Sequence, residues 1–93
     1  MTALQQYASD ILQAATKHGV NKVRVFGSFA LGTPTPSSDL DLLVNLEPGR
    51  DLLDLIALKQ ELEMQTGRKV DVVTEKGLSP YLREKILRQA RPL

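Results

Sequence analysis

The sequence contains no cysteine, so neither disulfide bonds nor thiolate zinc sites can form, and this absence fits a reducing cytoplasm. It also has no excess of one charge, because 12 Lys and Arg against 11 Asp and Glu leave a net charge of +1. Proteins that coat phosphate backbones usually have a strongly basic face. We therefore do not expect nucleic acid as a direct substrate.

Long apolar segments are absent as well. No run approaches the roughly 18 residues that a transmembrane helix needs, and residues 1–6 lack the basic start and apolar block of a secretory signal. These features predict a soluble, cytoplasmic protein that does not enter the membrane. The 93 residues suit one domain spanning 1–93, since single domains typically have about 100–150 residues.

The first half of the chain shows helix and strand patterns in alternation. The run 22–26 alternates and is rich in β-branched residues, which predicts a strand. Glycine and proline make 32–38 a loop, and a second strand is predicted over 39–46. A first helix, ending at Gly19, is predicted from apolar residues at steps of three and four, namely Leu4, Tyr7, Ala8, Ile11, Leu12 and Ala15.

The second half continues the alternation. Asp51 is a good N-cap for a helix that ends at Gly67, and 69–74 predicts a third strand. Ser79 followed by Pro80 predicts a last helix, which Pro92 stops. The expected inner faces are Leu52, Leu55, Ile56, Lys59 and Leu62 in the longer helix and Leu82, Ile86, Leu87 and Ala90 in the last one. This order predicts an α+β fold in which helices flank a small mixed β-sheet.

Two carboxylates mark the second predicted strand. Asp39 and Asp41 are one residue apart, so both side chains point to the same face, while Leu40 and Leu42 point into the core. Such carboxylates repel each other unless a cation lies between them. Their hard oxygens suit Mg²⁺, which usually completes its shell with water and substrate phosphates.

The third predicted strand repeats this arrangement. Asp71 lies between Val70 and Val72, whose side chains face the other way. If the two strands are neighbours, Asp71 can lie roughly 5 Å from an aspartate of the other strand. Three carboxylates clustered in this way can hold two metal ions for in-line phosphoryl displacement.

Gly27 and Ser28 follow the first strand, where the chain enters a short helical segment over 28–31. Glycine lets the backbone approach a phosphate closely, and the Ser28 hydroxyl with the following N–H groups can donate to its oxygens. Taken singly, each motif has a plainer reading as a turn, a strand edge or a solvated cap. The fixed pattern of Gly-Ser, ten residues and Asp-x-Asp arises by chance in about one in a thousand chains of this length.

The segments 25–28 and 38–44, with Gly32 between them, resemble the signature of the DNA polymerase beta-type nucleotidyltransferase superfamily, and 70–73 resembles its third metal-ligand strand. The short length resembles the minimal nucleotidyltransferases (MNT) of prokaryotes. The resemblance implies that Gly27 and Ser28 bind the triphosphate. It also implies that the three aspartates bind two Mg²⁺ ions, with Mn²⁺ as a substitute, and that Asp71 helps to deprotonate the acceptor. Leu31 stands where many relatives have arginine, which removes a phosphate contact.

Minimal nucleotidyltransferases are often similar to antitoxins encoded beside a HEPN-domain ribonuclease toxin. The resemblance therefore implies transfer of AMP from ATP to a hydroxyl, with a tyrosine of a HEPN toxin as acceptor. Two alternatives stay open: a non-catalytic antitoxin that binds and occludes its partner, and a small-molecule nucleotidyltransferase that works as a homodimer.

Other polar and aromatic residues have plain interpretations. His18 is expected at the surface near a helix end, and Tyr7 in the core. Packing is favoured over base stacking for Tyr81. Arg68 and Lys69, which precede Asp71, are interpreted as solvated charges, with phosphate screening as the alternative.

Overall fold

The computed structural model describes residues 3–93, and it confirms the α+β prediction. Four strands form one mixed sheet in the order β3-β2-β1-β4, with β2 and β3 parallel and the other pairs antiparallel. No helix in the described residues is long and apolar enough to cross a membrane. In chain order the elements are α1 (Ala3–Lys17), β1 (Val20–Phe26), α2 (Ser28–Leu31), β2 (Leu40–Leu46), α3 (Leu52–Thr66), β3 (Val70–Thr74), η1 (Glu75–Gly77), α4 (Pro80–Gln89) and β4 (Arg91–Pro92).

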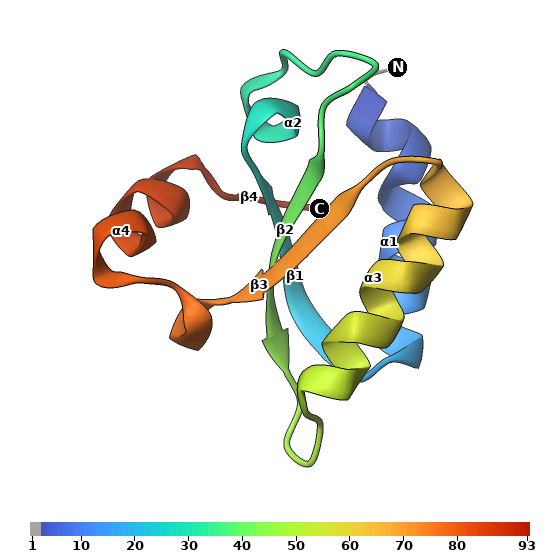
Figure 1. Cartoon of the computed structure of the whole chain (residues 1–93), viewed down its shortest axis with the longest axis vertical. Helices are drawn as coiled ribbons and strands as arrows, with labels where there is room; N and C mark the ends of the chain where they lie inside the picture. The colour runs from blue at the N-terminus through green and yellow to red at the C-terminus, as the bar shows by residue number, and fades with distance from the viewer. Residues whose placement is uncertain (1–2) are drawn as a thin grey trace.

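The two faces of the sheet are covered unequally. Figure 1 shows α1 and α3 together on one side of the sheet and α4 on the other, with α2 at one end of β1. Alternate residues of β2 point towards α1 and α3, and among them Leu40, Leu42 and Val44 are fully buried. Ile11 of α1 and Leu58 of α3 close this core from the helix side.

The inner face predicted for α3 is partly wrong. Leu55 and Leu62 are buried, but Leu52 and Ile56 are 67% and 42% exposed, and Leu58 is buried in their place. The first half of α3 is apolar on several sides, so periodicity alone does not select one stripe. The helix starts as predicted: Asp51 and Asp54 form a capping box with the backbone.

The outer helices also differ from expectation in part. Leu12 of α1 is 42% exposed and Leu82 of α4 is 52% exposed. Tyr81, for which packing was favoured, is 94% exposed. His18 follows α1 as predicted, but it is not a surface residue: its side chain is only 17% exposed, and its Nε2 lies 3.2 Å from Oε1 of Glu61 on α3. Tyr7 packs at the margin of the core, also as predicted.

Two features of the sheet carry no clear sequence signal. The pairing of β1 with β2 is irregular between Asn21 and Arg24, and Lys22 has a positive φ of 49°. This bulge lets Val20 and Val23 both face the core, although they are three residues apart. At the β4 edge of the sheet, Pro92 belongs to the edge strand itself, although it was expected only to stop a helix. The last helix, α4, already ends at Gln89.

Candidate functional site

The carboxylates lie on the sheet face opposite α1 and α3. Asp41 of β2 is paired with Phe26 of β1 on one side and with Asp71 of β3 on the other. The predicted juxtaposition of Asp41 and Asp71 is therefore confirmed. Asp39 immediately precedes β2, in the position that places it two residues before Asp41 on the same side. Strand order brings together residues that are 30 positions apart in the chain.

The close packing of these acids changes the proton affinity of Asp41. Partial burial, chiefly, and then the charges of Asp71 and Asp39 raise the pKa of Asp41 from 3.8 to about 6, and a hydrogen bond with Asp71 acts in the same direction. A carboxylate in this setting gains from any positive charge placed beside it. The site is thus electrostatically prepared for a cation.

The acids nevertheless do not form a complete metal cage. Within residues 3–93, no three Asp, Glu, His or Cys side chains converge as a ready set of metal ligands. Mg²⁺ does not need such a set, because it usually binds through one or two carboxylates and takes its other ligands from water and phosphates. The oxygen donors of Asp39, Asp41 and Asp71 fit that kind of shared coordination.

Gly27 is required here by both conformation and space. Its φ of 71° and ψ of −151° lie in a region that only glycine adopts readily. A Cβ at this position would stand 2.3 Å from Oδ2 of Asp41. The sequence indicated that this glycine lets a phosphate approach the backbone; the structure shows that it also makes room for the Asp41 carboxylate.

Ser28 begins α2, a single helical turn that ends at Gly32 in the left-handed conformation. Phe29 is buried in the core and anchors the turn, which places the start of α2 beside the carboxylates. Leu31 is 62% exposed. Gly27, which lies against the Asp41 carboxylate, directly precedes this turn, so the start of α2 follows that contact in the chain.

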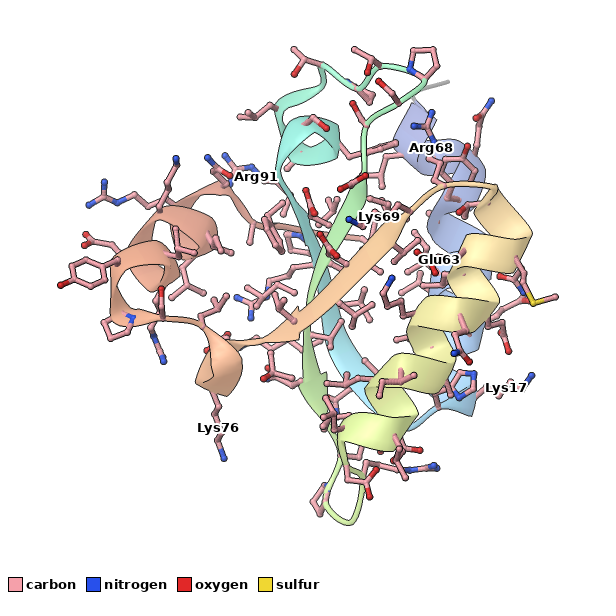
Figure 2. All side chains as sticks on the ribbon, in the orientation of Figure 1. Lys17, Glu63, Arg68, Lys69, Lys76 and Arg91 are labelled. Atoms are coloured by element: carbon pink, nitrogen blue, oxygen red, sulfur yellow. The ribbon has the colours of Figure 1, made fainter. Side chains whose placement is uncertain are left out.

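Arg68 has a different role from either interpretation made from the sequence. Its Nη1 donates to the carbonyl oxygens of Thr35 (2.9 Å) and Ser38 (3.1 Å), and its guanidinium lies 4.9 Å from the centre of the Phe29 ring. Figure 2 shows Arg68 beside this loop, above the ends of α1 and α3. Arg68 therefore anchors the loop that leads into Asp39. Lys69 is exposed, as expected for a solvated charge.

Glu63 was also missed by sequence reasoning. Its Oε2 accepts a hydrogen bond of 3.0 Å from the backbone N–H of Val70, and Lys59 binds the same carboxylate at 2.9 Å. These bonds, first that of Lys59, lower the pKa of Glu63. In Figure 2 Glu63 points from α3 towards β3. The contact fixes the residue that precedes Asp71.

A charged cluster lies next to the carboxylates on the same face. Arg24 is paired with Leu43, two residues along the strands from the pair of Phe26 and Asp41 and therefore on the same face. Its guanidinium forms an ion pair with Glu75, which also lies 3.8 Å from Nη2 of Arg83 on α4. The Nε of Arg24 is buried without a hydrogen-bond partner among the described residues. Glu75 thus connects β1 with α4.

The sequence matches characterised families over most of its length. The family model of the nucleotidyltransferase domain matches residues 8–93. A relative from Methanocaldococcus jannaschii, inferred to be a protein adenylyltransferase, is 42% identical over 80 residues, which are 86% of this chain and 86% of the relative. Protein adenylyltransferase MntA of Thermococcus cleftensis is 36% identical over 73 residues, which are 78% of this chain and 74% of MntA.

Solved structures share the fold. One solved structure, inferred to be a minimal nucleotidyltransferase, has a TM-score of 0.86 and is 48% identical to this chain. The match covers 100% of this chain and 97% of that chain. The complex of a tri-AMPylated HEPN toxin with its MNT antitoxin from Shewanella oneidensis contains a chain with a TM-score of 0.72 and 20% identity. There 95% of this chain and 69% of that chain are covered, and the likeness is one of fold alone.

Proposed function

This chain belongs to the nucleotidyltransferase domain family as a minimal nucleotidyltransferase, and we propose that it is an antitoxin that transfers AMP from ATP to a tyrosine hydroxyl of a partner HEPN-type toxin. The observation that carries the proposal is the row formed by Asp41 and Asp71 in register, beside the side-chain-free backbone of Gly27. Such a row provides charge for metal ions and access for a triphosphate.

The three aspartates are assigned to metal binding. Asp39, Asp41 and Asp71 would hold two Mg²⁺ ions, and Mn²⁺ has the same preference for oxygen ligands. When bound, the ions neutralise the triphosphate and stabilise the attacking and leaving oxygens. The raised pKa of Asp41 supports this assignment, because the burial and neighbouring carboxylates that cause it also favour a cation beside the group.

Gly27 and Ser28 are assigned to the triphosphate. Gly27 carries no side chain, so a phosphate could approach its backbone, and the hydroxyl of Ser28 at the start of α2 would donate to the phosphate oxygens. Asp71, on the outer strand β3 of the sheet, orients the acceptor hydroxyl and takes up its proton. A free tyrosine has a pKa near 10 and needs this assistance at neutral pH.

A protein acceptor agrees with the names of the relatives. MntA is named a protein adenylyltransferase, and the Methanocaldococcus jannaschii relative is assigned the same activity by inference. The structure with the HEPN toxin describes a toxin that carries three AMP groups. The first test is calorimetric titration with ATP. We expect binding with Mg²⁺ or Mn²⁺ and almost none in EDTA, because unshielded carboxylates repel a triphosphate. Equal affinity in the two conditions would remove the metal assignment.

The second test addresses the acceptor. Co-expression with the product of the adjacent gene, followed by intact mass measurement, should show one or more AMP additions on that protein. The Asp71→Asn variant should give an unmodified partner. Loss of the signal in a Tyr→Phe variant of the partner would identify the acceptor group.

Leu31 favours a second candidate function. Leu31 is 62% exposed. The family resemblance implies an arginine at this position in many relatives, so this chain would lack one phosphate contact. A purely binding antitoxin would silence its partner by occlusion. An unmodified partner that is still bound and inactive in the presence of Mg²⁺ and ATP would support this alternative.

A further inference from the structure

The charges of the chain are divided between its two parts. Residues 1–75 contain seven Lys and Arg against ten Asp and Glu, a net charge of −3, whereas residues 76–93 contain five against one, a net charge of +4. The near-neutral total of +1 conceals this division. The basic part comprises α4 with its flanking segments.

This basic helix lies beside the proposed active site. Figure 1 shows α4 on the side of the sheet away from α1 and α3. Asp41 and Asp71 alternate with the buried Leu40, Leu42 and Val70, so they face this side as well. Ile86 is its buried anchor, and Arg83 reaches Glu75, which holds Arg24 of β1. Ile86 and Arg83 thus tie the helix to the rest of the chain, but the Arg83 side chain remains 51% exposed, so Arg83 also contributes to the free side of α4.

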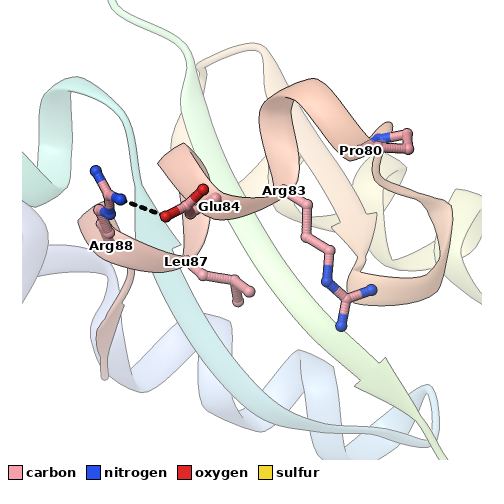
Figure 3. A pocket seen from close by; sticks show the side chains of 5 residues that line it. All are labelled: Pro80, Arg83, Glu84, Leu87 and Arg88. Carbon is pink, nitrogen blue, oxygen red and sulfur yellow. Dashed lines mark hydrogen bonds and ion pairs between the residues drawn. The ribbon is translucent and has the colours of Figure 1, made fainter.

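The free side of α4 combines apolar and cationic groups. Tyr81 is 94% exposed and Leu82 52% exposed. A hollow of about 450 Å³ is lined by Pro80, Arg83, Glu84, Leu87 and Arg88. In Figure 3 Leu87 and Arg83 extend from α4 towards this hollow, and the ion pair between Glu84 and Arg88 lies at one end of it. Tyrosine and arginine around an apolar centre are the composition that protein interfaces favour.

We propose that α4 is the docking surface for the acceptor protein, and that the segment it holds is acidic with an apolar side chain at its centre. The apolar side chain would occupy the hollow beside Leu87, while its carboxylates pair with Arg83, Lys85 and Arg88. This inference rests on the proposed function, since the protein that α4 would hold is the acceptor of the proposed transfer. It goes further by naming the surface and its chemistry.

A protein segment fits this surface better than RNA. The ten acidic residues of 1–75, three of them in the neighbouring row, repel a continuous phosphate backbone, which needs an extended basic track. An acidic segment of a folded protein places its negative charge locally. The exposed Tyr81 and the half-exposed Leu82 add apolar area.

The test uses labelled synthetic peptides and fluorescence anisotropy. One peptide carries a central Leu and a Tyr flanked by Glu, the second has Lys for each Glu, and a single-stranded RNA of similar length is the third probe. Titrations are made in EDTA without ATP, so no chemistry takes place. We expect the Glu peptide to bind at least about tenfold more tightly than either other probe, with an affinity that falls as salt increases.

Charge reversal locates the surface. Lys85→Glu with Arg88→Glu should weaken binding of the Glu peptide about tenfold. The control, Lys17→Glu with Lys22→Glu, changes the net charge equally on exposed lysines outside α4 and should alter affinity less than about twofold. Circular dichroism verifies folding, and Lys85→Gln with Arg88→Gln provides a milder pair. Equal affinity for the two peptides, equal weakening by both double variants, or preferred binding of RNA would overturn the proposal.

The outcome is separable from that of the proposed function. Asp41→Asn should bind the Glu peptide as the wild type does, although we expect it to transfer no AMP. Docking without any transfer by the wild type would contradict the proposed chemistry alone. If the Lys85→Glu with Arg88→Glu variant transferred AMP to the co-expressed partner as the wild type does, that result would contradict the docking surface alone.

Discussion

The two faces of the sheet are built from the same strands, and both contain buried leucines, but only one of them gathers charge. Towards α1 and α3, residues such as Leu40, Leu42 and Val70 are fully buried. Towards the open side, their immediate neighbours Asp41 and Asp71 gather negative charge in a half-buried row. Because side chains alternate along a strand, one residue step separates a group that stabilises the fold from one assigned to chemistry. The first face gains from removing water, and the second needs ions and substrate.

The largest effect should come from breaking the charged face. Asp41→Asn removes one ligand charge but little volume, so AMP transfer should fall about a thousandfold or more, which corresponds to several kcal/mol of lost transition-state stabilisation. Transfer to the co-expressed partner measures it. Asp10→Asn, on the exposed surface of α1, is the matched control and should transfer normally. An active Asp41→Asn enzyme would show that the assignment is wrong.

The neighbouring residue on the buried face should show the opposite behaviour. Leu42→Ala leaves a cavity among fully buried side chains and should lower the free energy of unfolding by about 3 kcal/mol. Leu53→Ala, at a position that is 72% exposed, should cost about 0.5 kcal/mol or less. Urea denaturation of both variants compares them. Similar losses would indicate that α3 or β2 is packed differently.

The charged face should also reduce the stability of the metal-free protein. The pKa of Asp41 is raised from 3.8 to about 6, so the folded state holds this proton more tightly than the unfolded chain and loses stability as the pH rises through that window. In EDTA at pH 7.5, Asp41→Asn should therefore be more stable than the wild type, by about 1 to 2 kcal/mol given the partial exposure of the group.

The difference between the two proteins should vanish only below about pH 3, where Asp41 is protonated in the unfolded chain as well as in the folded state. Thermal unfolding at a series of pH values checks the sign. A wild type that gains stability relative to Asp41→Asn as the pH rises from 4 to 7 would contradict the electrostatic account.

The smallest effect concerns the loop that joins the two faces. Arg68→Gln removes the bonds to Thr35 and Ser38 and the contact with Phe29, and should cost about 1 kcal/mol. Hydrogen exchange should accelerate in 33–38 while the core of the sheet stays protected. Arg68→Lys keeps the charge but not the planar fork, so it should resemble Arg68→Gln. Full protection in Arg68→Lys would mean that charge alone anchors the loop.

Much of the local structure could be predicted from the sequence. The alternation around Asp41 and Asp71, the N-caps Asp51 and Ser79 and the glycine after the first strand all follow from rules that act within a few residues. The side of the strand on which each aspartate lies is therefore already decided by the sequence. The same holds for the Gly-Ser motif, whose spacing to Asp39 and Asp41 pointed to the family.

Only the tertiary structure decided which distant residues meet. Pairing of β2 with β3 brings Asp41 beside Asp71, and the turn after β1 brings Gly27 against Asp41. The contacts of Arg68 with the loop, the burial of Leu58 in place of Leu52 and the exposure of Tyr81 have no local signature. Hydrophobic burial has no preferred direction, so an apolar helix such as α3 takes its rotation from the surface that it covers, and long side chains take their partners from whatever the fold places within reach.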